Sequence, residues 1–92
     1  MGGDPPTHAL EITLSAEKVL LRRNRWWTFL RKAIDNLQED PEPDGFSRFV
    51  APANSGYSGC LQYEVYPWRI YYQLVNPARV IVIAIVPHPT QL

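Results

Sequence analysis

Side chains capable of chemistry gather in one stretch of the sequence, residues 60–75. Glu64 and Arg69 flank the dipeptide Tyr66-Pro67, which is typical of a turn. A hairpin closed there brings Glu64 close to Arg69 on a face that carries Gln62, Glu64, Arg69, Tyr71 and Gln73. One interpretation is a solvated face with a cross-strand ion pair, which contributes little when exposed. The other is a shallow binding surface lined by Glu64, Arg69 and Tyr71.

A second candidate site is a basic segment near the N-terminus. It contains Lys18, Arg22, Arg23, Arg25, Arg31 and Lys32 and no acid, and an acidic segment from Asp35 to Asp44 follows it. These charges form either a solvated helix face followed by an acidic loop, or a basic ridge that binds phosphate or an acidic partner. The formal net charge of the chain is zero, which weighs against a simple nucleic-acid-binding domain.

Other chemistries lack the residues they need. Cys60, His8 and His88 are too far apart in sequence for metal-ligand spacing, and no glycine-rich phosphate loop is present. Cys60 has no evident base beside it, so a buried thiol is favoured over a nucleophile. We therefore expect neither a metal nor a cofactor.

The elements that position these residues follow from periodicity. Residues 1–8 read as a flexible tail, and Ala9–Leu14 alternates as a strand. Ser15 is the expected N-cap of a helical segment over residues 16–38, whose apolar stripe keeps a 3.6-residue period. Asn24 is the best internal break, so the segment is one long helix or two helices joined there.

A long irregular connection, residues 38–59, precedes the sheet, and we expect Phe46 and Phe49-Val50 to anchor it, the latter as a short strand. Residues 60–66, 68–75 and 79–86 alternate as three strands joined by turns at 66–67 and 76–78, which makes a meander. The last strand is apolar on both faces, as a covered central strand should be.

The predicted core lies between the helical segment and one face of the meander. The sheet contributes Leu61, Tyr63, Val65, Trp68, Ile70, Tyr72 and Leu74, and the cover is Trp26, Trp27, Leu30, Ile34 and Leu37. Trp26 and Trp27 point about 100° apart on a helix, so one is central and the other lies at the edge of the core or is exposed as an anchor for a partner.

Composition is consistent with one α+β domain over residues 9–92. The chain has 92 residues, 46% of them hydrophobic, and a single cysteine, which indicates a reducing compartment. The first residues do not resemble a signal peptide, and the apolar run Val80 to Pro87 is too short to span a bilayer. The expected location is the cytoplasm, without membrane association.

The order of these elements resembles that of the RelE/ParE toxin superfamily. These toxins belong to bacterial type II toxin–antitoxin systems, some of which are described as plasmid-stabilisation systems. The resemblance covers roughly residues 9–88. It is carried by the helix end Leu37 to Gly45, by Gly59 leading into Cys60–Val65, by the core Trp68-Arg69-Ile70-Tyr71-Tyr72-Gln73-Leu74-Val75, and by Val80–His88. It implies a RelE/ParE-like fold, with an N-terminal strand and helical segment packed on a C-terminal antiparallel meander, and a cognate antitoxin as partner.

Members of this superfamily act in two ways, and the resemblance implies different roles for the candidate residues in each case. RelE-like members cut mRNA on the ribosome with the RNA 2′-OH as nucleophile, whereas ParE-like members poison DNA gyrase. In the first case Arg69 stabilises charge at the scissile phosphate, Glu64 is a general base for the 2′-OH and His88 is a general acid. Further contacts to the target are expected from the helical residues Arg22, Arg23, Arg25, Arg31 and Lys32 and from the sheet residues Gln62, Tyr71 and Gln73.

Three functions remain open from the sequence. The first is a ribosome-dependent endoribonuclease that binds RNA through the basic ridge. The second is a non-catalytic relative that binds a protein such as gyrase. The third is an interaction module of this fold that forms a homodimer through an unpaired sheet edge.

Overall fold

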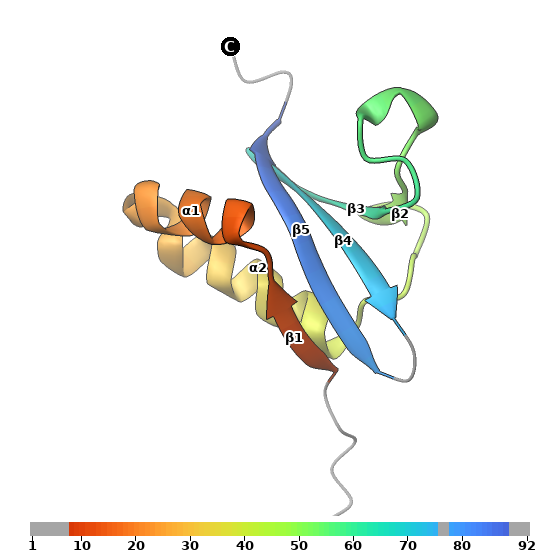
Figure 1. Ribbon diagram of the computed structural model, residues 1–92, viewed down its shortest axis with the longest axis horizontal. Coiled ribbons are helices and arrows are strands. Elements are labelled where there is room, and N and C mark those ends of the chain that lie inside the picture. The colour runs from red at the N-terminus through yellow and green to blue at the C-terminus, as the bar shows by residue number, and fades with distance from the viewer. Residues whose placement is uncertain (1–7, 76–77, 89–92) are drawn as a thin grey trace, which may run out of the picture.

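The computed structural model describes residues 8–75 and 78–88, and this part of the chain forms an α+β fold in two layers. One layer is a five-stranded sheet in the order β1-β5-β4-β3-β2, and helices α1 and α2 cover one of its faces (Figure 1). The elements are β1 (Ala9–Ile12), α1 (Leu14–Arg22), α2 (Trp27–Glu39), β2 (Arg48–Val50), β3 (Leu61–Val65), β4 (Trp68–Val75) and β5 (Arg79–Pro87).

The predicted meander is confirmed, and the sheet extends beyond it on both sides. β3, β4 and β5 pair antiparallel, and the bounds of β4 are those expected. β5 is central, as predicted, because β1 pairs with it on the outside. That pairing is parallel, so the sheet is mixed rather than wholly antiparallel. Residues 76 and 77 of the predicted second turn lie outside the described residues.

The helical segment is two helices rather than one. Arg23 ends α1 with a non-helical backbone (φ −103°, ψ 53°), and a 3-10 turn over Asn24–Trp26 leads into α2. The joint lies where Asn24 predicted it. α1 begins two residues earlier than expected, because β1 ends at Ile12 and Thr13, not Ser15, is the N-cap of α1.

Thr13 connects α1 to an irregularity in the central strand. Tyr71 pairs with Ala84 and Tyr72 with Val82, so Ile83 is an extra residue in β5. The Thr13 hydroxyl donates to the Ile83 carbonyl (2.6 Å) and accepts from the backbone N–H of Ala16 (3.3 Å). The Thr13 hydroxyl therefore caps the helix and also binds the extra carbonyl, which accepts a second, longer hydrogen bond from the Ser15 hydroxyl (3.3 Å).

The main core lies where predicted, between the helices and one sheet face. It is built on Leu30, Ile34, Leu37, Tyr63, Trp68, Ile70, Tyr72, Val80 and Val82, all buried. Trp26 packs against this core edge-to-face with Trp68, at 6.0 Å between ring centroids. Trp27 is 47% exposed and does not cover the core, so the prediction that only one of the two tryptophans packs there is confirmed. The two side chains diverge because consecutive helical positions cannot face one core.

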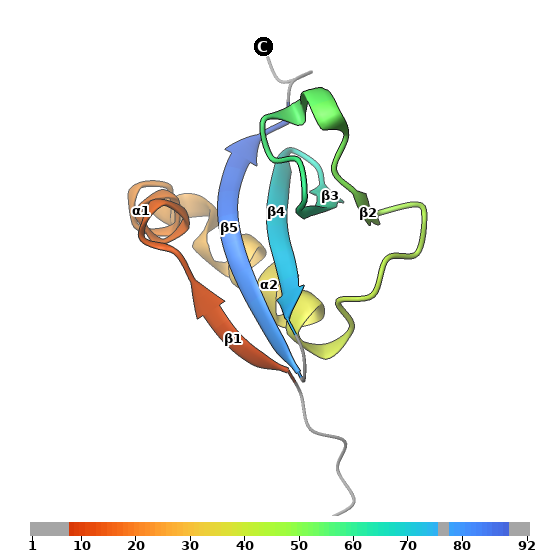
Figure 2. The ribbon, with the colours of Figure 1, turned by 45° about the vertical axis from the view of Figure 1, so that its right-hand side comes forward.

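Part of the second sheet face is also covered, contrary to expectation. Figure 2 shows the segment between β2 and β3 folded back over the sheet. Tyr57 of this segment stacks on Tyr71 with 4.1 Å between ring centroids, and Ala51, Cys60 and Ala84 complete a small buried cluster. Tyr71 is therefore only 2% exposed, and Gln62 on the same face is 3% exposed, so neither is solvated as expected.

The acidic connection after α2 is organised by a base from β2. Asp44 accepts hydrogen bonds from the backbone N–H groups of Phe46, Ser47 and Arg48, and these hold its pKa well below the ordinary range. Arg48 forms ion pairs with Asp40 (3.4 Å) and Asp44 (3.1 Å). Phe46 is 87% exposed, so the prediction that it anchors the connection was wrong: this turn directs its side chain outward. The predicted short strand at Phe49-Val50 is confirmed by β2.

Candidate functional site

Three strands bring Glu64, Arg69 and His88 together at one end of the sheet. Glu64 in β3 and Arg69 in β4 are direct register partners across the hairpin. His88 follows the last residue of β5, and its backbone N–H donates to the carbonyl of Pro67 in the hairpin turn (2.9 Å). Because Glu64 and Arg69 alternate with the core residues Tyr63 and Ile70, this cluster lies on the sheet face away from the helices.

The Glu64 carboxylate is the centre of the cluster. One oxygen, Oε2, accepts from Arg69 Nε and from the side-chain amide of Gln62 (2.7 Å). The other, Oε1, contacts His88 Nε2 at 2.8 Å and Arg69 Nη2 at 3.4 Å. The predicted cross-strand pair is thus present. It is only about a quarter exposed on each side, so it is better shielded than a surface pair.

Electrostatics keep this carboxylate ionised. Partial burial acts to raise the pKa of Glu64, but the hydrogen bonds from Arg69, Gln62 and His88 and the charge of Arg69 outweigh it and lower the pKa. The hydrogen bond to Glu64 in turn raises the pKa of Arg69, and Tyr71 adds to this effect. A carboxylate with a lowered pKa and two engaged oxygens is suited to orient its partners rather than to take up a proton.

The remaining predicted binding residues fall into two groups on opposite layers. On the sheet, Gln73 is exposed, Gln62 is buried, and Tyr71 is buried under Tyr57 of the segment after β2. On the helices, Arg22, Arg23, Arg25 and Lys32 are exposed, and Arg31 is half-buried between Asp35 and the Trp27 ring. The helical cations therefore do not share a surface with Glu64 and Arg69.

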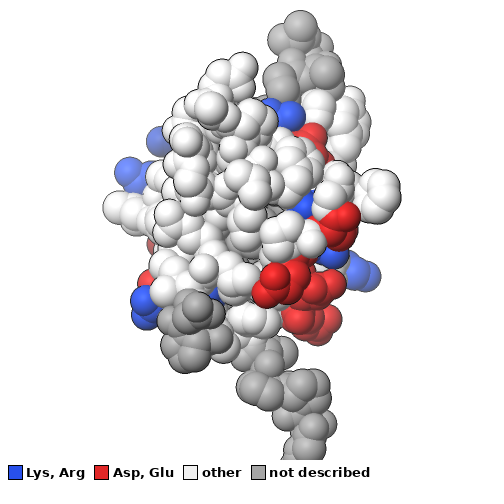
Figure 3. All heavy atoms as spheres, turned by 90° about the vertical axis from the view of Figure 1, so that its right-hand side faces the viewer, with Lys and Arg blue, Asp and Glu red and all other residues white. Residues whose placement is uncertain are grey.

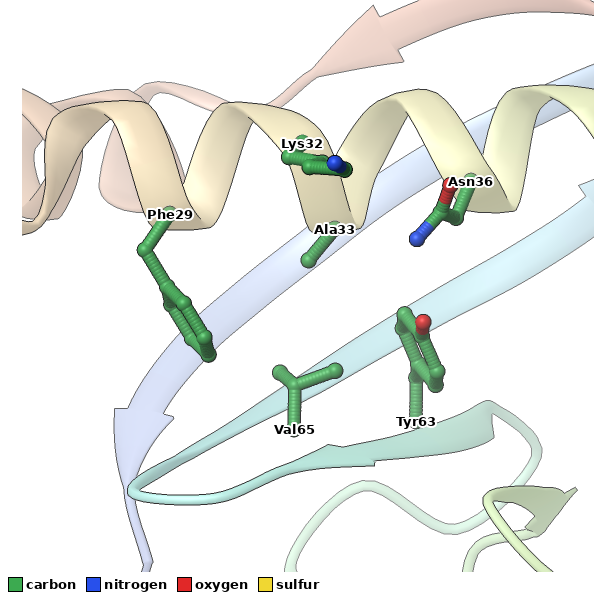
Figure 4. Close-up of a pocket in the computed structure, with 6 residues that line it drawn as sticks. All are labelled: Phe29, Lys32, Ala33, Asn36, Tyr63 and Val65. Carbon is green, nitrogen blue, oxygen red and sulfur yellow. The ribbon is translucent and has the colours of Figure 1, made fainter.

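An apolar hollow lies between α2 and β3, on the helix side of the sheet. Phe29, Ala33 and Asn36 project from α2 toward Tyr63 and Val65 of β3, with Lys32 at the rim (Figure 4). The hollow carries no acid–base pair and is separated from Glu64 by the sheet, so it is not part of the polar cluster.

Within residues 8–75 and 78–88, no group of three or more His, Cys, Asp or Glu side chains is placed to hold a metal ion. Over the same residues, none of the helices has the length and apolar character needed to cross a membrane.

Sequence comparison decides the family. Residues 10–91 match the family model of the ParE toxin of the type II toxin–antitoxin system parDE. The chain belongs to the ParE toxin family. Solved RelE and ParE relatives share its fold, so the predicted superfamily is confirmed, and this toxin is a member of a type II toxin–antitoxin system. No curated protein matches the chain.

The similar structures are remote in sequence. The toxin–antitoxin complex RelBE2 from Mycobacterium tuberculosis matches with a TM-score of 0.70 at 13% identity, over 89% of this chain and 99% of the other. The archaeal RelE–RelB complex from Pyrococcus horikoshii gives 0.68 at 13%, over 92% and 99%. A YoeB/ParE toxin from Agrobacterium tumefaciens gives 0.59 at 20%, over 87% and 98%. At these identities the likeness establishes the fold.

Two features of the toxin's site were missed from the sequence. The cover provided by Tyr57 had only a weak signal, an aromatic residue between Gly56 and Gly59 in a long connection. Both glycines adopt positive φ, which lets the segment turn back onto the sheet. The contact from Gln62 to Glu64 had a clearer signal, because residues two apart in a strand share a face.

Proposed function

We propose that this toxin is an endoribonuclease that cleaves mRNA on the ribosome, with Arg69 and His88 as its catalytic residues and Glu64 as the group that holds them. The observation that carries the proposal is the convergence of Arg69 and His88 on the carboxylate of Glu64 at one end of the sheet. The family also contains toxins that act without catalysis, so the proposal concerns the mode of action within an established family.

The geometry supports a division of labour at a phosphodiester. The RNA 2′-oxygen attacks the adjacent phosphorus, the bond from phosphorus to the 5′ oxygen breaks, and the products are a 2′,3′-cyclic phosphate and a 5′-hydroxyl. Arg69 stabilises the charge of the pentacoordinate phosphate, because a guanidinium has five N–H donors and Glu64 engages only two of its nitrogens. His88 gives a proton to the departing 5′ oxygen, while the 2′-OH proton passes to solvent.

This assignment changes one predicted role. The sequence suggested Glu64 as the general base, but its lowered pKa and its contacts make it a weak proton acceptor. Glu64 instead holds the guanidinium and the imidazole at a fixed separation. Fixing the catalytic groups in place before the reaction lowers the entropic part of the activation barrier.

The proposed partner is a cognate antitoxin. The structures from Mycobacterium tuberculosis and Pyrococcus horikoshii are toxin–antitoxin complexes, and family membership makes the same kind of partner the natural one here. A homodimer through the edge strands β1 or β2 stays a prediction from the sheet order.

A second function, binding of a protein target such as gyrase without catalysis, is favoured by the charge distribution. The charges of Glu64 and Arg69 cancel, and the chain is formally neutral. Figure 3 shows that uncharged side chains cover most of the face beyond β2, with acidic residues gathered at one side. The basic side chains of the helices lie on the other layer, where they could contact a protein instead.

Inducible expression in a bacterial host separates the two functions. The variants are the wild type, Arg69→Ala, a combined Arg22, Arg23 and Arg25 to Ala variant, and Arg79→Ala as a matched control. Arg79 also lies on the sheet, but in an exposed pair with Glu11 at the other end of β5. The ribonuclease proposal predicts growth arrest that Arg69→Ala relieves and Arg79→Ala does not. Arrest relieved only by the helical variant supports protein binding, and growth without arrest for all four excludes both functions.

A further inference from the structure

We infer that Gln62 is a positioning residue of the toxin site, whose buried amide holds the Glu64 carboxylate in the orientation that engages Arg69 and His88. The effect of Gln62 on catalysis rests on the proposed function, but the contact between Gln62 and Glu64 can be measured in a protein without ribonuclease activity.

The placement of Gln62 favours this role over one in packing. Its side chain is 3% exposed, between β2 and β4, where a polar group is costly to bury. Its amide nitrogen donates to Glu64 Oε2 at 2.7 Å. Its carbonyl oxygen has no hydrogen-bond partner among the described protein groups, a condition shared only with the indole nitrogen of Trp68. The chain thus buries an amide that satisfies one group, the carboxylate of Glu64.

The direction of the amide is fixed by charge. Nitrogen and oxygen of a glutamine amide are exchanged by a half-turn about the last side-chain bond, and the surroundings decide between the two. The reversed amide would place its oxygen 2.7 Å from a carboxylate oxygen, where like partial charges repel. Gln62 therefore acts as a donor toward Glu64, and it shares Oε2 with Arg69 Nε while His88 occupies Oε1.

An apolar isostere separates positioning from packing. Gln62→Met keeps the length and volume of the side chain and removes both the donor and the unsatisfied carbonyl. Loss of the donor raises the pKa of Glu64, because a hydrogen bond to the charged form is gone. Removal of the unsatisfied carbonyl stabilises the fold, whereas loss of the hydrogen bond to the Glu64 carboxylate destabilises it at pH 7, so the two effects on the melting temperature oppose each other. RNA cleavage falls, by up to about 100-fold if the carboxylate and its partners shift by an ångström.

The first experiment is a titration of the Glu64 side-chain carboxyl by carbon NMR in the wild type, Gln62→Met and the control Gln73→Met. Gln73 is a glutamine of the neighbouring strand whose amide contacts Cys60 rather than Glu64. The inference predicts a raised pKa of Glu64 in Gln62→Met and an unchanged pKa of Glu64 in Gln73→Met. An unchanged pKa of Glu64 in Gln62→Met, whatever the melting temperature, assigns Gln62 to packing and overturns the inference.

A measurement on the wild type covers the case in which the variant does not fold. The side-chain amide protons of Gln62 must shift in the pH range in which Glu64 titrates, and those of Gln73 must not. Amide protons of Gln62 that ignore this titration refute the contact. A wild type that shows the contact but cleaves no RNA leaves the positioning of Glu64 intact and contradicts only the ribonuclease proposal.

Discussion

Replacing Glu64 by Gln tests the electrostatics of the site without changing its shape. The substitution removes a carboxylate that accepts from Arg69, Gln62 and His88. Hydrogen bonds to a charged group contribute about 1.5–3 kcal/mol each when buried, and exposed ion pairs contribute about 0–1 kcal/mol. Because the Glu64 side chain is 24% exposed, we expect Glu64→Gln to lower the free energy of unfolding at pH 7 by about 1–2 kcal/mol.

The pH dependence gives this prediction its sign. The pKa of Glu64 is lower in the folded state than its ordinary value of 4.5. Its ionised form therefore stabilises the fold above pH 4.5, and this contribution is lost as the pH falls through the lowered value. The wild type should exceed Glu64→Gln in stability at pH 7, and the difference should shrink toward pH 3.

Urea denaturation at both pH values measures the effect, and the exposed Glu42→Gln is the matched control. The Glu42 side chain makes no ion pair among the described residues, since Arg48 contacts only its backbone carbonyl. Equal stability of wild type and Glu64→Gln at pH 7, or a difference that persists unchanged at pH 3, would refute the reasoning.

Three further substitutions test how the fold supports the site. Tyr72→Phe removes a buried hydroxyl that donates to the Pro41 carbonyl at 2.6 Å, and it should lower the free energy of unfolding by about 1–3 kcal/mol in urea denaturation; no loss means that water replaces the bond. Thr13→Val should lower the melting temperature by roughly 4–8 °C, while Thr13→Ser retains the cap; equal effects contradict the hydroxyl's role. Tyr57→Ala should speed hydrogen exchange at Tyr71 beyond the effect of Tyr57→Phe, and equal exchange rates would contradict a stabilising stack.

The sequence predicted the parts of the fold that depend on regular patterns. Alternation located β4 at its observed bounds, and the central position of β5 followed from its two apolar faces. Asn24 marked the joint between the helices, although the unbroken phase of the apolar stripe could not decide between one helix and two.

What the sequence could not predict depends on contacts between distant segments. The choice of Thr13 as N-cap follows from the Ile83 carbonyl in a strand seventy residues away. The burial of Tyr71 follows from Tyr57, in a connection without periodicity. The sequence paired Glu64 with Arg69 across the hairpin, but the contact of His88 with the same carboxylate depends on a distant strand end and became apparent only in three dimensions.

The most direct test of the proposed activity is the fate of mRNA in a translating bacterial extract to which the purified toxin is added. The ribonuclease proposal predicts new fragments with 2′,3′-cyclic phosphate and 5′-hydroxyl ends, produced by the wild type and by Arg79→Ala but not by Arg69→Ala. The contradicting result is a wild-type toxin that arrests growth but leaves the transcripts intact. It would rule out RNA cleavage by Glu64, Arg69 and His88 and establish a toxin that acts by binding.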